Sequence, residues 1–193
     1  MAAQFNNMEP VQSPRHTFLL QRFRQEQDDD APCLAITGSI RRQGDILSLQ
    51  YRVSGDIGEL VYSLPEGPGR RRHGLWQRSC FEAFLGSRGA ARYWEVNLAP
   101  GGDWNVYAFS NYREGMVEET AIGSLPSAFH VGEDEIWLDL QLDLRPLFRQ
   151  GQLVEAGISA VMEHRDGAKS HWALSHQGSV ADFHHRSGFQ LTL

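Results

Sequence analysis

The feature of this sequence that most restricts its fold is an alternation of apolar and polar side chains with a period of two residues. It is clearest in residues 135–142, where one face is formed by Ile136, Leu138, Leu140 and Leu142. A close match to the same period runs through residues 45–53. Successive side chains of a β-strand point to opposite faces of the sheet, so both segments are predicted to be half-buried strands.

Short strands of this kind account for most of the chain. About ten are predicted, they are joined by loops rich in turn-forming residues, and no amphipathic helix is long enough to connect parallel strands. This pattern predicts an all-β fold, an antiparallel β-sandwich of the jelly-roll type. The predicted strands are residues 16–23, 33–41, 45–53, 59–64, 78–85, 92–98, 104–109, 135–142, 154–163, 170–174 and 189–193. Residues 143–148 are predicted to form a single helical turn.

One domain is expected, covering residues 16–193, because the chain contains no internal repeat and no second hydrophobic core. Residues 1–15 are expected to be a flexible lead-in. The N-terminus lacks a basic segment followed by an apolar one, and no apolar stretch approaches the ~18 residues that a membrane span requires. We therefore expect a cytoplasmic protein without a membrane partner, in which Cys33 and Cys80 are not paired and are both small buried residues.

The charge of the chain argues against nucleic-acid binding. The 24 acidic residues outnumber the 18 basic ones and give a net charge of −6, whereas a nucleic-acid site needs basic charge gathered on one face. Three arginines occur together in the glycine-rich loop 66–74, and three aspartates occur in residues 28–30. Both segments are interpreted as solvated loops rather than as an anion site and a metal site.

The central strand predicted for residues 92–98 has two faces of different chemistry. Trp94, Val96 and Leu98 form an apolar face that belongs in the core. Tyr93, Glu95 and Asn97 share the opposite face. A ring, a carboxylate and an amide suit a sugar-type ligand, because the ring stacks on the C–H face of the sugar and the polar groups meet its hydroxyls. The alternative interpretation is an ordinary solvated sheet face.

Tryptophans near loop-to-strand boundaries extend this candidate site. Trp76 and Trp104 lie beside loops, and Trp172 lies in a short late strand between two histidines. Exposed tryptophans at sheet rims often mark binding sites, although packing in the core is the alternative for each of them. The candidate ligand-binding residues are Trp76, Arg78, Glu82, Tyr93, Glu95, Asn97, Trp104, Asn105, Tyr107, Trp172, His176 and His184.

No recognised catalytic motif occurs, so the chain is predicted not to be an enzyme. Glu82 and Glu95 lie on neighbouring predicted strands, and one hairpin register would set them opposite each other, as the paired carboxylates of glycoside hydrolysis require. A structural or ligand-orienting role is the preferred interpretation. The late histidines match no zinc-binding spacing, and the adjacent His184 and His185 would point to opposite faces of a strand, so no metal is expected.

Four segments together resemble the DOMON-like group of bacterial proteins, which is related to carbohydrate-binding module family nine. They are residues 74–86, 93–100, 102–107 and 170–184. The resemblance implies a jelly-roll-like β-sandwich that binds a ligand without catalysis. In the carbohydrate-binding relatives a sugar is held between tryptophans, a part that Trp76, Trp104 or Trp172 would take here, and calcium is sometimes present. Other relatives bind haem with axial ligands that include Met, and Met116 and Met162 are available for this role.

The expected function is therefore that of a non-catalytic module that binds a carbohydrate or a sugar-containing small molecule. No cofactor is expected, with haem and calcium as the alternatives. A haem-binding domain, a protein-interaction domain with a protein partner, and a glycoside hydrolase that uses Glu82 and Glu95 are the alternative functions.

Overall fold

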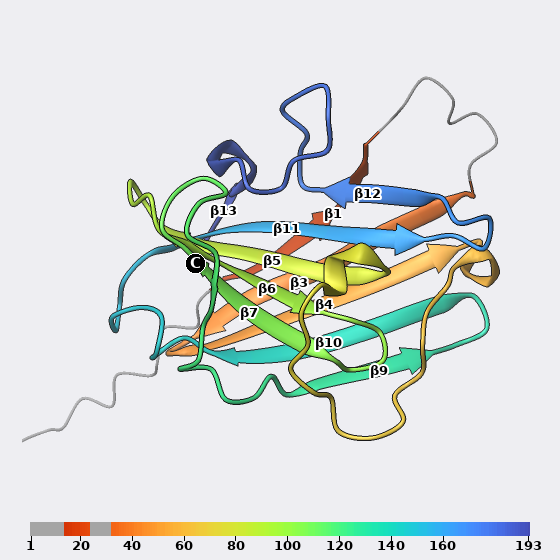
Figure 1. Ribbon diagram of the computed structural model, residues 1–193, viewed down its shortest axis with the longest axis horizontal. Helices are drawn as coiled ribbons and strands as arrows, with labels where there is room; N and C mark the ends of the chain where they lie inside the picture. The colour runs from red at the N-terminus through yellow and green to blue at the C-terminus, as the bar shows by residue number, and fades with distance from the viewer. Residues whose placement is uncertain (1–13, 24–31) are drawn as a thin grey trace, which may run out of the picture.

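Two antiparallel β-sheets packed face to face form the protein, as the alternation predicts (Figure 1). The computed structural model describes residues 14–23 and 32–193. The five-stranded sheet has the order β1 (Arg15–Leu19), β3 (Leu34–Gln43), β4 (Ile46–Gly55), β10 (Glu135–Asp143) and β9 (Ser127–Val131). The eight-stranded sheet has the order β2 (Gln21–Arg22), β12 (Lys169–Ala173), β11 (Val154–Glu163), β5 (Cys80–Ser87), β6 (Tyr93–Leu98), β7 (Trp104–Phe109) and β8 (Val117–Glu118), with β13 (Leu191–Thr192) paired to β11.

The main hydrophobic core lies between the two sheets and takes alternate residues from each strand. The predicted inward face of β10 is buried throughout, and so are Trp94, Val96 and Leu98 of β6. Leu49 and Val53 of β4, which pairs with β10, belong to the same core. Full burial of each such aliphatic side chain is worth roughly 1.5 to 3 kcal/mol, so this face holds the sandwich together.

The structure differs from the sequence prediction at Cys33, which is exposed whereas Cys80 is buried as predicted, and at several segments of the chain. Residues 59–64 form no strand, because only Leu60 bridges to His164 after the 3-10 turn η1 (Ile57–Glu59). Strand β9 was not predicted, since this edge strand is largely exposed and lacks alternation. The expected helical turn at 143–148 is a turn in which the Leu147 and Phe148 amides both donate to the Leu144 carbonyl. Residues 1–13 of the predicted lead-in, and the aspartates 28–30, lie outside the described residues.

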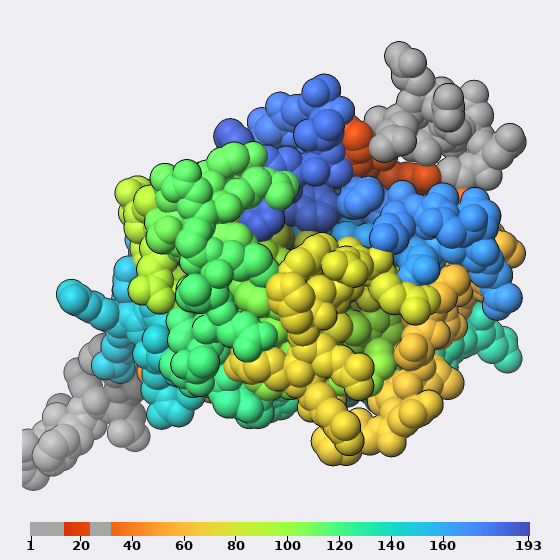
Figure 2. Space-filling view, in the orientation of Figure 1, coloured from red at the N-terminus to blue at the C-terminus, as the bar shows by residue number. Residues whose placement is uncertain are grey.

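Three long connections cover the outer face of the eight-stranded sheet. They are residues 65–79, which include the 3-10 turn η2 (Leu75–Gln77), residues 110–122, and residues 175–190, which include the 3-10 turn η3 (Arg186–Gly188). In the space-filling view these yellow, green and dark blue segments converge over the same face of the molecule (Figure 2). All residues of β6 and β7 are therefore buried, on both faces of the strand.

The segment 175–190 approaches the sheet closely at two glycines. A Cβ atom at Gly86 of β5 would lie 1.8 Å from a guanidinium nitrogen of Arg186, and one at Gly157 of β11 would lie 3.1 Å from the Phe189 ring. Glycine permits this approach because it has no side chain. Arg186 uses the space to donate to the Ser87 carbonyl at 2.7 Å and to pair with Glu155 at 2.8 Å. Among the described residues there is no helix with the length and apolar character needed to cross a bilayer.

Candidate functional site

A cavity of about 320 Å³ lies on the outer face of the eight-stranded sheet, beneath the three covering segments. Its wall combines aromatic rings with a small number of charged and polar groups, and is formed by Trp76, Glu82, Phe84, Glu95, Phe109, Arg113, Met116, Val161, His171, Ala181, Phe183 and His184. Three other hollows have volumes of about 340, 470 and 510 Å³, but none of them is lined by a buried carboxyl. The cavity beneath the loops is therefore the candidate functional site.

The two glutamates of the cavity come from neighbouring strands. Glu82 of β5 pairs with Asn97 of β6, and Glu95 of β6 pairs with Phe84 of β5. The carboxyls are thus diagonal neighbours on one face of the sheet, and not directly opposite each other. Glu82 is 2% exposed and Glu95 is 4% exposed. Two carboxyls so deeply buried side by side are unusual unless hydrogen bonds or a ligand stabilise them.

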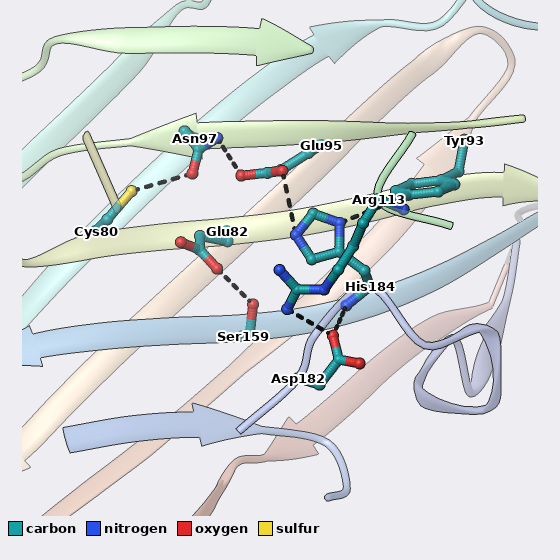
Figure 3. Close-up of polar contacts among 9 residues, drawn as sticks. All are labelled: Cys80, Glu82, Tyr93, Glu95, Asn97, Arg113, Ser159, Asp182 and His184. Carbon is teal, nitrogen blue, oxygen red and sulfur yellow. Dashed lines mark hydrogen bonds and ion pairs between the residues drawn. The ribbon is translucent and has the colours of Figure 1, made fainter. Parts of the chain in front are cut away.

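Each glutamate has one short hydrogen bond, shown in Figure 3. Glu95 Oε1 accepts from the Asn97 amide at 2.7 Å, and the Asn97 oxygen accepts from the Cys80 thiol at 3.4 Å. Glu82 Oε2 accepts from the Ser159 hydroxyl of β11 at 3.0 Å. Asn97 and Cys80 are fully buried, so they orient Glu95 from behind the cavity wall.

Burial makes both carboxyls weak acids. Loss of hydration raises the pKa of Glu82, and repulsion by Glu95 raises it further. Loss of hydration also raises the pKa of Glu95, against the opposing effects of the Asn97 hydrogen bond and of Arg113. The pair therefore keeps a proton at a pH where ordinary carboxyls have lost theirs.

His184 connects this pair to the covering segments. Burial, assisted by the positive charge of Arg113, lowers the pKa of His184 to about 4, so the ring is neutral at pH 7. The Tyr93 hydroxyl accepts from the Arg113 amide at 3.1 Å and lies 2.8 Å from His184 Nδ1. When Tyr93 donates to Nδ1, the neutral ring carries its proton on Nε2, which faces Glu95 Oε2 at 3.9 Å.

An ion pair between Arg113 and Asp182 links two of the covering segments, residues 110–122 and 175–190. The Arg113 guanidinium lies 2.9 Å from Asp182 Oδ1, which also accepts from the His184 amide at 3.1 Å. Arg113 has φ of 55°, a left-handed conformation that is uncommon for a residue other than glycine. This turn brings both the amide and the guanidinium of Arg113 to the cavity side of the sheet.

The structure places six of the twelve predicted site residues in or directly behind the cavity. Trp76, Glu82, Glu95 and His184 line it. Tyr93 and Asn97 lie behind the wall, hydrogen-bonded to lining residues.

Trp104 and Trp172 lie elsewhere, and the expectation that they face the ligand needs correction. Both are 5% exposed and belong to the main core between the sheets. Trp104 lies on the same side of β7 as Val106 and Ala108, so the strand period turns it inward although a loop precedes it. Trp172 also points inward, and its indole N–H donates to the Ser170 hydroxyl at 2.9 Å.

The remaining four predicted residues make structural contacts outside the cavity wall. Asn105, which is fully buried, donates to the Tyr107 hydroxyl at 2.8 Å and accepts from Arg71 at 2.6 Å. Arg78 pairs with Glu163 at 2.8 Å. His176 bonds to the Gln21 carbonyl through Nε2 at 2.8 Å.

Sequence reasoning missed several residues of the cavity wall. Phe84 lies two positions after Glu82, and Phe109 lies two positions after Tyr107, so the strand period was a usable signal for both. Arg113, Met116 and Phe183 come from the covering segments, where no period exists. They reach the site through contacts between distant parts of the chain.

The solved structures that are similar to this chain include the following three. One is "a putative carbohydrate-binding protein" from Bacteroides uniformis, with a TM-score of 0.68 and 15% sequence identity over 91% of this chain and 84% of that one. Two are a carbohydrate-binding module of family 9 from Caldicellulosiruptor kristjanssonii, each with 9% identity. The complex with cellotriose has a TM-score of 0.49 over 82% of this chain and 72% of that one. The complex with glucose has a TM-score of 0.46 over 76% and 69%.

The similarity to the Bacteroides uniformis structure confirms the predicted β-sandwich. No protein-family model matches the sequence. No curated protein matches it either.

Proposed function

We propose that this chain is a carbohydrate-binding module that holds a sugar or a sugar-containing small molecule in the cavity of the eight-stranded sheet. The observation that carries the proposal is the composition of the cavity wall. Aromatic side chains surround a floor that bears Glu82 and Glu95, with Arg113 and His184 beside them. This is the combination that a sugar needs, with rings for its C–H face and hydrogen-bonding groups for its hydroxyls.

The size and position of the cavity support a small ligand. Its volume of about 320 Å³ lies at the lower end of the ~300 to 1,000 Å³ typical of ligand pockets. The rings of Phe84, Phe109 and Phe183 line a cavity and do not form an open flat face, which favours a small molecule over a docked protein partner. The fold similarity to a protein described as carbohydrate-binding is consistent with this function. Membership of the DOMON-like group, a bacterial origin and a cytoplasmic location remain predictions from the sequence.

Calorimetry of the purified chain against a panel of mono- and disaccharides tests this proposal. We expect at least one sugar to bind, and Trp76→Ala to weaken that binding at least tenfold, because stacking on the ring is lost. Trp137→Ala is the matched control, since Trp137 lies on the five-stranded sheet and outside the cavity wall. Absence of binding across the panel by a folded sample would contradict the proposal.

One observation favours a second candidate, a glycoside hydrolase. Glu82 and Glu95 face the same cavity from neighbouring strands, as the two carboxyl groups of a glycoside hydrolase must. A raised pKa also suits a general acid. Release of free sugar from a glycoside, abolished separately by Glu82→Gln and by Glu95→Gln, would establish this activity. Binding of the glycoside without turnover would leave the non-catalytic function.

The cavity is poorly suited to haem, the cofactor that the resemblance also suggests. Met116, His171 and His184 line it, and the two glutamates lie in the same wall. Met162 lies in the main core, 2% exposed. The carboxyl pair on the floor would repel the propionates of a haem. Among the described residues, no group of three or more His, Cys, Asp or Glu is placed to hold a metal ion.

A further inference from the structure

The cavity holds more acidic groups than basic groups that can balance them. Glu82, Glu95 and Asp182 lie in or beside the wall, and Arg113 is the single arginine or lysine among the lining residues described. Arg113 already pairs with Asp182 at 2.9 Å. His184 and His171 add no positive charge near pH 7, because burial lowers the pKa of both rings. Beyond Arg113, which is shared with Asp182, no arginine or lysine among the described lining residues balances the two glutamates.

The hydrogen bonds of the pair are also incomplete. Ser159 donates to Oε2 of Glu82, and in the described part of the chain no donor reaches Oε1. Glu95 accepts one short hydrogen bond, from Asn97, while His184 Nε2 stays at 3.9 Å. A carboxylate accepts up to about four hydrogen bonds, so both groups have lone pairs to offer. Figure 3 shows the two carboxyls on adjacent strands, on the side of the sheet where Arg113 and His184 lie.

The rest of the wall attracts cations as well. Four aromatic side chains line the cavity, namely Trp76, Phe84, Phe109 and Phe183. The face of an aromatic ring carries partial negative charge and attracts an ammonium group. Rings and Met116 supply no oxygen ligands, whereas hard metal ions require about six to eight of them. The wall therefore fits an organic cation better than a metal ion.

We propose that the ligand of this cavity carries a protonated amino group that binds between Glu82 and Glu95, against the aromatic wall. This inference rests on the proposed carbohydrate-binding function and specifies the ligand class as an amino sugar. The ammonium group would donate to the free lone pairs of both carboxyls, and the sugar ring would pack on the aromatic side chains. A neutral sugar offers hydroxyl donors but leaves the repulsion between the two carboxyls in place.

The number of protons that the protein releases on binding distinguishes an amino sugar from a neutral sugar. An ammonium group stabilises the ionised carboxyls, so protons that the pair holds in the free protein are released to the buffer as the amine binds. A neutral sugar has no charge with which to displace them. Calorimetry in two buffers of different ionisation enthalpy measures the number of protons released.

The decisive experiment titrates the full chain near pH 7 with four probes: D-glucosamine, N-acetyl-D-glucosamine, D-glucose and cyclohexylamine. We expect D-glucosamine to bind at least about tenfold more tightly than the two neutral sugars, as a charge-assisted hydrogen bond allows. Proton release is expected with D-glucosamine alone among the three sugars. Glu95→Gln should remove most of this preference, and the exposed Glu133→Gln should leave it unchanged.

The outcomes distinguish this inference from the function on which it rests. Equal or tighter binding of D-glucose, or binding of D-glucosamine without proton release, would overturn the amino-sugar inference and leave carbohydrate binding intact. Binding of cyclohexylamine without any sugar would support the cation site and contradict the carbohydrate function. Failure of all four probes would count against both. The proton count of the unaltered chain decides the matter even if Glu95→Gln does not fold.

Discussion

The outer faces of the two sheets follow the same alternation but lie in different environments. On the five-stranded sheet the outward side chains of β4 and β10 include Gln50, Arg52 and Asp139, which reach solvent. On the eight-stranded sheet the outward side chains Glu82 and Glu95 are almost fully buried, because the covering segments lie over them. Alternation thus determines which side of a strand a residue occupies, and the connections determine whether water reaches it.

This difference changes the free-energy cost of removing the hydrogen-bond partner of a polar side chain. An exposed polar side chain can exchange a protein partner for water at little cost. A buried one has no such replacement, so loss of a partner leaves it unsatisfied. The covered face should therefore respond strongly to single substitutions, and the open face should respond weakly.

The largest contrast is expected for aromatic residues on the two outer faces. Phe84→Ala should lower the free energy of unfolding by about 3 to 5 kcal/mol, because it opens a void among Tyr93, Phe109 and Phe189. Trp137→Ala on the open face should cost less than half as much, since the ring is only partly buried. Urea unfolding followed by circular dichroism measures both values. Equal losses would show that the covering segments add no packing.

Tyr93→Phe tests the hydrogen bonds of the covered face. It removes the hydroxyl that bonds to His184 Nδ1 and accepts from the Arg113 amide, so we expect a loss of about 1 to 3 kcal/mol. Tyr62→Phe is the control, because no hydrogen bond of the Tyr62 hydroxyl is formed within the described residues. A similar loss in both variants would mean that these hydrogen bonds contribute little.

The glutamate pair predicts a pH dependence that the open face lacks. Because the folded pKa values of Glu82 and Glu95 are raised, the unfolded chain gives up its protons first, and stability falls as pH rises from the ordinary carboxyl range to the raised values. The expected loss is about 1.4 kcal/mol per pH unit wherever the folded pair holds one extra proton. Chemical unfolding from pH 5 to 8 should show this slope. Glu82→Gln should flatten it and Glu133→Gln should not.

The smallest effect is expected at Arg52. Its guanidinium lies 3.2 Å from Glu135 and 5.4 Å from the centre of the Trp137 ring, but more than half of the side chain is exposed. Exposed ion pairs are typically worth less than about 1 kcal/mol, so Arg52→Ala should change the unfolding free energy by about 0.5 kcal/mol or less. A loss above that of Tyr93→Phe would remove the distinction between the two faces.

Much of the sandwich could be predicted from the sequence, because strand periodicity is a local property. The division of β6 into Trp94, Val96 and Leu98 on one side and Tyr93, Glu95 and Asn97 on the other is confirmed by the structure. The same rule, applied within β7, would have turned Trp104 inward with Val106. The loop that precedes Trp104 suggests exposure, but the strand period determines the orientation of the ring.

The covering segments could not be predicted in the same way. Arg113 reaches the cavity through a left-handed turn, and it pairs with Asp182 across 69 positions of the sequence. Neither the left-handed turn nor the ion pair produces a periodic pattern in the sequence. The covering segments bury the Glu82 and Glu95 carboxyls. The strand period therefore predicts which strand residues face the candidate site, but it does not predict their burial.

The glycine at position 157 of β11 allows the covering segment that carries Phe183 and His184 to lie directly on the eight-stranded sheet. Because Phe189 and Gly188 of that segment pack directly on Gly157, the absence of a side chain there sets the depth of the cavity. A methyl group at position 157 would press on the Phe189 ring and the Gly188 carbonyl and push that segment away from the sheet, which would widen the space above the glutamates. The size of the accepted ligand is thus adjustable at a position that lies outside the cavity wall.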